Sequence, residues 1–241
     1  MAEVLAVGEG NSARVLVFIP SLGDVDALPG MLGQIAELGP QFRALILDDG
    51  SAPAITRPAG APLFASLPAN LGLGVCTGIA IDHAIRHGYG GMARVDGDGQ
   101  HAIADIPRLL APIRNGTADL VLGVRVNRNA TGPLGRRLVR NYFNAMAGLL
   151  TSGAAPADVN SGFFVAGRKA MTLLSRATFE RFPEPEMVVT ACRGGLRVAA
   201  VDVEQNQRAG GDSTLDPVAA ALMLFRFHVF ALGELLRGKA K

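Results

Sequence analysis

The sequence predicts an α/β fold, with a doubly wound, mostly parallel sheet flanked by helices. Short and fully apolar runs alternate with helical apolar periods from residue 14 to about residue 124. Strands that helices cover on both faces lose the alternation of polar and apolar side chains, so such runs indicate a buried parallel sheet. Carboxylates directly follow two of these runs, and the carboxyl ends of the strands are where such sheets bind ligands.

Five strands and three helices are expected in the first half of the chain. The strands are the apolar runs at residues 15–19, 44–47, 92–95 and 120–122, with a weaker strand at 63–67. Apolar side chains at helical spacing predict helices over residues 24–38, 75–87 and 103–113, and the first two stop at a glycine.

The second half is less regular. We expect a helix at residues 138–150, a strand at 161–166, a short helix at 168–175 and a strand at 196–203. Residues 127–135 and 205–214 are polar loops that contain glycine. A last helix runs from Pro217, a favoured residue type at the first helical position, to about Arg237.

Composition limits the class of protein. The 241 residues suit one large α/β domain or two small ones, and 49% hydrophobic residues are enough for a sizeable core. A net charge of +2 without a basic run argues against a nucleic-acid binder. Cys76 and Cys192 lie far apart in apolar runs and are expected to be reduced core thiols of a cytosolic protein. The first residues lack the pattern of a signal peptide, so a cytoplasmic location is expected.

The acidic segment DGDGQ, residues 96–100, directly follows the strand at 92–95. A calcium-sensing loop is excluded, because glycine at loop position 6 and glutamate at position 12 would be needed where His101 and Pro107 stand. An ordinary Asp/Gly turn explains the glycines but leaves two adjacent carboxylates that repel each other. Mg²⁺ or Mn²⁺ bound to a diphosphate would join them. The spacing of these residues alone does not decide between an ordinary turn and a metal site.

The stretch VDGDGQH, residues 95–101, is similar to the Asp-x-Asp-Gly-Gln-His motif of family 2 glycosyltransferases with the GT-A fold. Most of all it resembles the dolichyl- and polyprenyl-phosphate sugar synthases. Further blocks follow the order of that family over about residues 14–215: IPSLGD (19–24), LDDGS (47–51), NLGLG (70–74), DVNSGFF (158–164), FPEPE (182–186) and RAGGDST (208–214). The resemblance implies a GT-A glycosyltransferase domain at residues 1–215 and a C-terminal apolar helix at 216–241.

The resemblance implies a donor, a UDP- or GDP-sugar, that binds together with Mg²⁺ or Mn²⁺. It assigns the metal to Asp96, Asp98 and Gln100, and the metal would neutralise charge on the leaving nucleoside diphosphate. The residues implied for the donor are Pro20, Asp24, Asp49, Gly72, Gly74, Asp96, Arg208 and Ser213. For residues 48–51 a helix cap or turn is the alternative to a nucleotide contact.

The implied acceptor is a polyprenyl phosphate, and the implied reaction inverts the configuration at the anomeric carbon of the sugar. Asp158, Arg125 and Arg208 are the candidate catalytic residues, with the arginines at positions 136, 137 and 140 as further candidates for the acceptor phosphate. A phosphate attacks unaided, whereas a hydroxyl acceptor needs a carboxylate base, for which Asp158, Glu184 and Glu186 are available.

Two other functions stay open. The same fold could transfer sugar to a saccharide hydroxyl in cell-surface polysaccharide synthesis. The chain could also be a non-catalytic nucleotide-sugar-binding scaffold, because Leu22-Gly23-Asp24 replaces an aromatic-Asn-Glu run usual in the family, and Val124 replaces a usual serine.

The last helix is apolar nearly all round, but Arg226, His228 and Glu234 interrupt it. It lacks the uninterrupted run of about 18 apolar residues that a membrane span requires. A homo-oligomer contact, a membrane-surface helix and a packed core helix are the three interpretations. The second would place the protein peripherally at the cytoplasmic face of a membrane.

Overall fold

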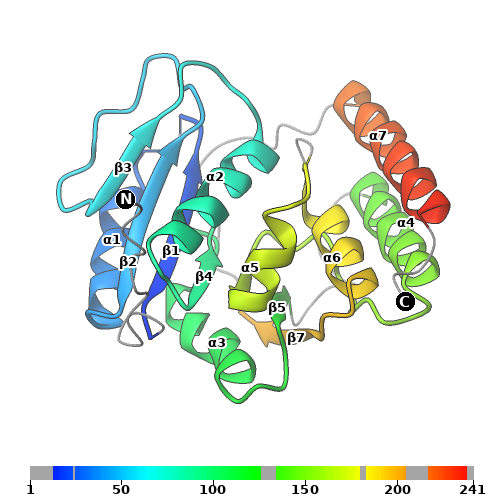
Figure 1. Cartoon of the computed structure of the whole chain (residues 1–241). Coiled ribbons are helices and arrows are strands. Elements are labelled where there is room, and N and C mark those ends of the chain that lie inside the picture. The colour runs from blue at the N-terminus through cyan, green and yellow to red at the C-terminus, as the bar shows by residue number, and fades with distance from the viewer. Residues whose placement is uncertain (1–12, 24, 126–133, 180–182, 205–216, 238–241) are drawn as a thin grey trace, which may run out of the picture.

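The computed structural model describes residues 13–23, 25–125, 134–179, 183–204 and 217–237. Within these ranges a 7-stranded sheet has the order β3-β2-β1-β4-β6-β5-β7, with helices on both faces (Figure 1). The predicted α/β class is confirmed.

The sheet is mixed but mostly parallel. Its strands are β1 (Val15–Ser21), β2 (Phe42–Asp48), β3 (Leu63–Ser66), β4 (Gly91–Arg94), β5 (Leu120–Arg125), β6 (Phe164–Gly167) and β7 (Val198–Val203). The pairs β1–β2, β2–β3, β1–β4 and β5–β7 are parallel. Strand β6 runs antiparallel to both of its neighbours, β4 and β5. All seven strands were predicted, most of them shorter or longer by a few residues.

The helices are α1 (Leu28–Glu37), α2 (Leu73–Arg86), α3 (Ile106–Arg114), α4 (Leu134–Leu150), α5 (Arg168–Leu174), α6 (Glu184–Arg193) and α7 (Pro217–Leu236). A 3₁₀ turn, Ile103–Asp105, precedes α3. Helix α1 begins four residues later than expected, with Pro29 in its first turn, where the missing N–H costs nothing. Helix α6 was not among the predicted helices; it begins inside the FPEPE block, at Glu184, and also has a proline, Pro185, in its first turn.

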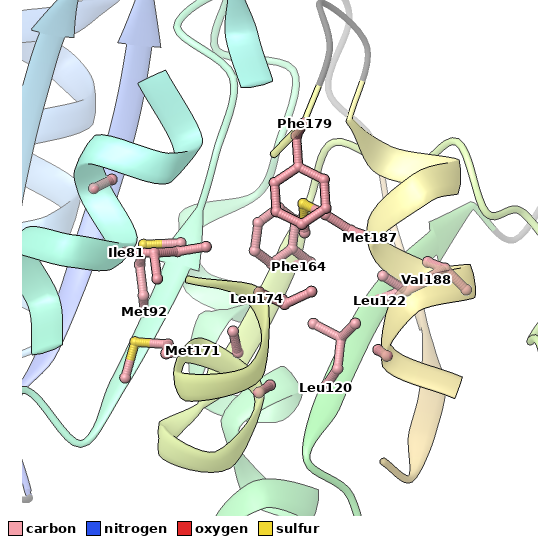
Figure 2. Close-up of a cluster of buried hydrophobic side chains, with 14 of the residues drawn as sticks. Ile81, Met92, Leu120, Leu122, Phe164, Met171, Leu174, Phe179, Met187 and Val188 are labelled. Atoms are coloured by element: carbon pink, nitrogen blue, oxygen red, sulfur yellow. The ribbon is translucent and has the colours of Figure 1, made fainter. Parts of the chain in front are cut away.

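The core has two layers, one on each face of the sheet. Because successive side chains of a strand point to opposite faces, Leu16 and Phe18 join one layer and Val17 joins the other. Helices α1 and α3 cover the second face, and α2, α4, α5, α6 and α7 contribute to the first. Figure 2 shows part of the first layer, where Phe164 and Leu122 of the sheet face Leu174 of α5 and Met187 of α6.

Both cysteines are free thiols that pack against this first layer, as predicted. Cys76 is fully buried in α2 and Cys192 is partly buried in α6. Burial, together with the negative charge of Asp49, raises the pKa of Cys76 to about 12. The Cys76 thiol therefore stays protonated at neutral pH.

Candidate active site

The two acidic segments meet at the end of β1. Strands β1, β2 and β4 are parallel neighbours, so their carboxyl ends lie on one rim of the sheet. The backbone N–H of Asp49 donates to the Ser21 carbonyl at 2.9 Å. On the other side, a Cβ built on Gly97 would lie 3.0 Å from the Pro20 carbonyl oxygen. The expectation that Asp49 and Asp96 share one rim is confirmed, and Pro20 lies between them.

Asp48 is a structural carboxylate that organises the loop after β2. It is buried and accepts hydrogen bonds from the Ser66 hydroxyl at 2.8 Å, from the Ser51 backbone at 2.9 Å and from the Ile55 backbone at 3.2 Å. Burial disfavours its charged form, but hydrogen bonds, above all one from the Ser51 hydroxyl, outweigh burial and lower the pKa of Asp48 below its usual value. Asp48 therefore remains ionised and fixes the direction in which Asp49 leaves the strand.

Asp49 holds the turn that begins α2. Its carboxylate accepts from the backbone N–H of Leu71 at 2.8 Å and of Gly72 at 3.0 Å. Gly72 is the residue before the helix and has φ +91°, a left-handed conformation that glycine adopts without strain. The hydrogen bonds of Asp48 to Ser51 and of Asp49 to Leu71 and Gly72 support the interpretation of this segment as a turn, and a contact of Asp49 with a nucleotide stays a prediction. Gly74 is buried in the first turn of α2.

Asp96 is held at both of its carboxylate oxygens. Oδ1 accepts from Arg94 Nη2 at 2.9 Å, and Oδ2 lies 3.1 Å from His101 Nε2. Burial alone would favour the protonated acid, but the charges and hydrogen bonds of Arg94 and His101 prevail and hold the pKa of Asp96 well below its usual range. The rim therefore carries a permanent negative charge in a fixed orientation.

Asp98 and Gln100 complete the acidic motif. The Gln100 backbone N–H donates to Asp98 Oδ1 at 3.1 Å, and both side chains are partly buried. Within the described ranges no three His, Cys, Asp or Glu side chains form a cluster that could hold a metal ion. Mg²⁺ and Mn²⁺ need only one or two protein carboxylates when phosphates and water supply the remaining oxygens. These oxygen donors therefore fit a hard divalent cation that arrives with a diphosphate.

The segment before β6 packs against the acidic motif. A Cβ built on Gly162 would lie 2.6 Å from Asp96 Oδ2, so only glycine leaves room for that carboxylate. The Ser161 hydroxyl donates to the Gly123 carbonyl of β5, which holds the segment at the rim. Asp158, at the start of the same block, is buried and has φ +63°, which is uncommon for a residue other than glycine.

Several predicted residues are not placed. Asp24, Arg208 and Ser213 lie outside the described residues, and so does most of each polar loop. Arg125 is the last residue of β5, where its backbone pairs with β7. Arg137 and Arg140 lie on the first turns of α4, exposed and partly buried respectively.

Sequence reasoning did not assign a role to Arg94, which the structure ties to Asp96. Its Nη1 also donates to Glu184 Oε1 at 2.7 Å. The signal was a single charged residue inside an otherwise apolar strand, two positions before Asp96. Positions two apart share one face of a strand, so the pair could have been proposed. The ion pair also occupies Glu184, one of the three candidate bases.

Comparison with known proteins shows which class of enzyme the chain resembles. No protein-family model matches the chain. It is 26% identical over 215 residues to the undecaprenyl-phosphate mannosyltransferase of Micrococcus luteus, covering 84% of this chain and 87% of that protein. It is 26% identical over 217 residues to the polyprenol monophosphomannose synthase of Mycolicibacterium smegmatis, covering 84% and 81%. An uncharacterised glycosyltransferase of Mycobacterium tuberculosis is 29% identical over 204 residues, covering 83% and 88%.

Solved structures agree on the fold. Glucosyl-3-phosphoglycerate synthase from Mycobacterium tuberculosis, in complex with Mn²⁺, UDP-glucose and phosphoglyceric acid, matches with a TM-score of 0.67 at 17% identity. The match covers 96% of this chain and 85% of that one. The fold is that of a GT-A glycosyltransferase. With the similarity in sequence, the chain is a glycosyltransferase of the hexosyltransferase type that resembles the polyprenyl-phosphate mannose synthases.

Proposed function

We propose that this enzyme transfers a sugar from a nucleotide-diphosphate donor to a polyprenyl phosphate, with inversion and with Mg²⁺ or Mn²⁺. The observation that supports it is the meeting of Asp49 and the Asp96–Asp98 motif at the end of β1, in a chain similar over 84% of its length to an undecaprenyl-phosphate mannosyltransferase. Asp49 and Pro20 would bind the nucleoside end of the donor. Asp98, Gln100 and Asp96 would face its diphosphate.

The transfer is a single in-line displacement. An oxygen of the acceptor phosphate attacks the anomeric carbon, the bond from that carbon to the diphosphate oxygen breaks, and the nucleoside diphosphate leaves with the electron pair. When bound, the metal ion neutralises the charge that develops on this leaving group. Asp98 and Gln100 orient the diphosphate end, and Arg208, which lies outside the described residues, would bind the diphosphate with them.

The acceptor side lies on α4 and the segment before β6. Arg137 on α4 and Arg125 at the end of β5 would bind the acceptor phosphate, because guanidinium groups bind phosphate oxygens through paired hydrogen bonds. Such a phosphate is already anionic and needs no general base. Asp158 would orient the acceptor or the sugar. Glu184 is unsuited to act as a base, since it is hydrogen-bonded to Arg94.

A donor panel tests this function. The protein would be incubated with Mn²⁺ and individual UDP- and GDP-sugars, with and without polyprenyl phosphate, and the lipid products would be identified by mass spectrometry. We expect one donor to yield a polyprenyl-phosphate sugar, and only when the lipid phosphate is present. If no donor is bound or consumed, or if sugar passes only to a saccharide hydroxyl, the proposal is wrong.

Helix α7 would contact the membrane that holds the acceptor. None of the described helices is both long and apolar enough to cross a membrane. Phe227 and Ala231 pack α7 onto the core, whereas the opposite face exposes a row of large apolar side chains at helical spacing: Leu222, Phe225, Val229, Leu232, Leu235 and Leu236. The row is exposed by 48–80%, and the basic side chain of Arg237 follows it. An exposed apolar helix face of this kind can insert into the surface of a lipid bilayer.

Removing this apolar row is expected to release the protein from membranes. The double substitution Phe225→Ser and Leu232→Ser should weaken binding to anionic vesicles, measured by co-sedimentation, by about 100-fold. Each large side chain contributes about 1.5 kcal/mol or more when it is buried, and about 1.4 kcal/mol corresponds to a tenfold change in affinity. The control is Leu71→Ser, an exposed apolar residue outside α7. If wild-type protein is a dimer without lipid and the double variant is a monomer that still binds vesicles, α7 is a subunit contact instead.

A further inference from the structure

A buried chain of charged groups lies behind the acidic motif. Arg94, the last residue of β4, reaches Glu184 through Nη1 at 2.7 Å and Asp96 through Nη2 at 2.9 Å. His101 lies 3.1 Å from the second oxygen of Asp96. One guanidinium group thus links the rim of the sheet to the first turn of α6.

The burial of Arg94 is costly, which makes a purely structural role unfavourable. Its side chain is 2% exposed, and its neighbours along the strand, Ala93 and Val95, are fully buried apolar residues. Taking a guanidinium group out of water costs several kcal/mol, and a buried ion pair often stabilises a fold less than apolar side chains of the same volume. An apolar residue would fill this position at lower cost.

Glu184 provides a negative charge that keeps Arg94 ionised and a hydrogen-bond acceptor that fixes its side chain. Its side chain is 11% exposed. It lies in the first turn of α6, where the partial positive charge of the helix N-terminus also favours a carboxylate. The planar fork of arginine can address Glu184 and Asp96 at the same time with separate N–H groups, which a lysine ammonium does less well. The guanidinium group of Arg94 also lies over the ring of Phe164, with its carbon 5.9 Å from the ring centre. This contact further limits the movement of the Arg94 side chain.

We propose that Arg94 is a positioning residue of the donor site: it fixes the Asp96 carboxylate beside Asp98, and Glu184 fixes Arg94. Groups that orient the residues around a metal ion commonly change metal affinity by about 10- to 100-fold when they are removed. The inference rests on the proposed donor function, because it concerns how the rim is prepared for a metal-bound diphosphate.

Mn²⁺ binding in the presence of UDP, and separately of GDP, measures this positioning without any turnover. Free Mn²⁺ would be followed by electron paramagnetic resonance, and the melting temperature by thermal shift. We expect Arg94→Lys to weaken Mn²⁺ binding about tenfold. Glu184→Ala should weaken it in the same direction, and Glu184→Gln should restore most of it, because the amide oxygen still accepts from Nη1.

The matched control is a second buried Arg–Glu pair that uses the same helix. Arg193 of α6 lies 2.9 Å from Glu234 of α7, and both side chains are 10% exposed. Arg193→Lys should lower the melting temperature and leave Mn²⁺ affinity unchanged.

The outcomes separate the two proposals. If wild-type protein binds no Mn²⁺ with either nucleotide, the proposed function fails and the inference fails with it. If wild-type protein binds but Arg94→Lys and Glu184→Ala bind equally well and only melt earlier, as Arg193→Lys does, the positioning role alone is wrong. Should Arg94→Lys not fold, the comparison of Glu184→Ala with Glu184→Gln decides, since full affinity in both would contradict the inference.

Discussion

Replacing Asp98 with Asn is expected to reduce sugar transfer by about 10²- to 10³-fold, the loss typical when one group that stabilises developing charge is removed. The amide keeps the size of the side chain and an oxygen that can accept from the Gln100 backbone, a bond of 3.1 Å in the native protein. The fold should therefore survive, while the negative charge that would hold a divalent cation on the diphosphate is lost.

Two measurements check this result. Steady-state transfer with the donor found in the panel should fall, and Mn²⁺ binding in the presence of the nucleotide should fall with it. Asp82→Asn is the control, because Asp82 is an exposed carboxylate on α2 that pairs with Arg86 at 2.7 Å, away from the rim. Retention of more than about a tenth of the activity in Asp98→Asn, with unchanged Mn²⁺ binding, would exclude a metal role for this residue.

Gly50→Ala is expected to lower the free energy of unfolding by about 2–5 kcal/mol, the sum of a left-handed backbone penalty and overpacking. Gly50 has φ +74°, and a Cβ there would lie 2.2 Å from the carbonyl carbon of Ala69. That neighbour is backbone and cannot turn aside. The clash would push apart the Asp49 loop and the turn that Asp49 holds, so donor binding should weaken as well.

A second variant separates the free-energy cost of the clash from the cost of the left-handed backbone conformation. Gly60 has φ +79°, but nothing lies within 4 Å of a Cβ built on it. Gly60→Ala should therefore cost only about 1–2 kcal/mol in urea unfolding. If both variants lose the same free energy of unfolding, the backbone of Ala69 can move away from the new Cβ at residue 50 without an energetic cost.

The sequence was sufficient to predict the strands, because most of them are apolar runs that are buried in the sheet, such as β1, β2 and β4, and β7 shows the alternation of a half-exposed strand. It did not predict the direction of β6, since an apolar run of four residues reads the same in a parallel and an antiparallel strand. It also placed the start of α4 four residues late, because Gly135 made residues 134–137 resemble the preceding loop. Direction and helix ends depend on tertiary contacts that local periodicity does not contain.

At the site, spacing predicted the acidic residues but not what surrounds them. Asp49 and Asp96 each follow a strand, and parallel neighbours end on one rim, so their proximity could be derived. Arg94 and Glu184 lie 90 positions apart, and only the packing of α6 brings them together. The roles of Asp24, Arg125, Arg208 and Ser213 stay predictions.

The reversed strand β6 has a consequence for how substrate choice can change. An antiparallel strand starts at the edge where its parallel neighbours finish, so the residues before Phe164 enter the rim from the opposite direction. Insertions or substitutions before Ser161 can therefore reshape the proposed acceptor side while β1, β2 and β4 keep their register. If the proposed function holds, such an arrangement lets new acceptor preferences arise, by evolution or by design, while the proposed donor site stays unaltered.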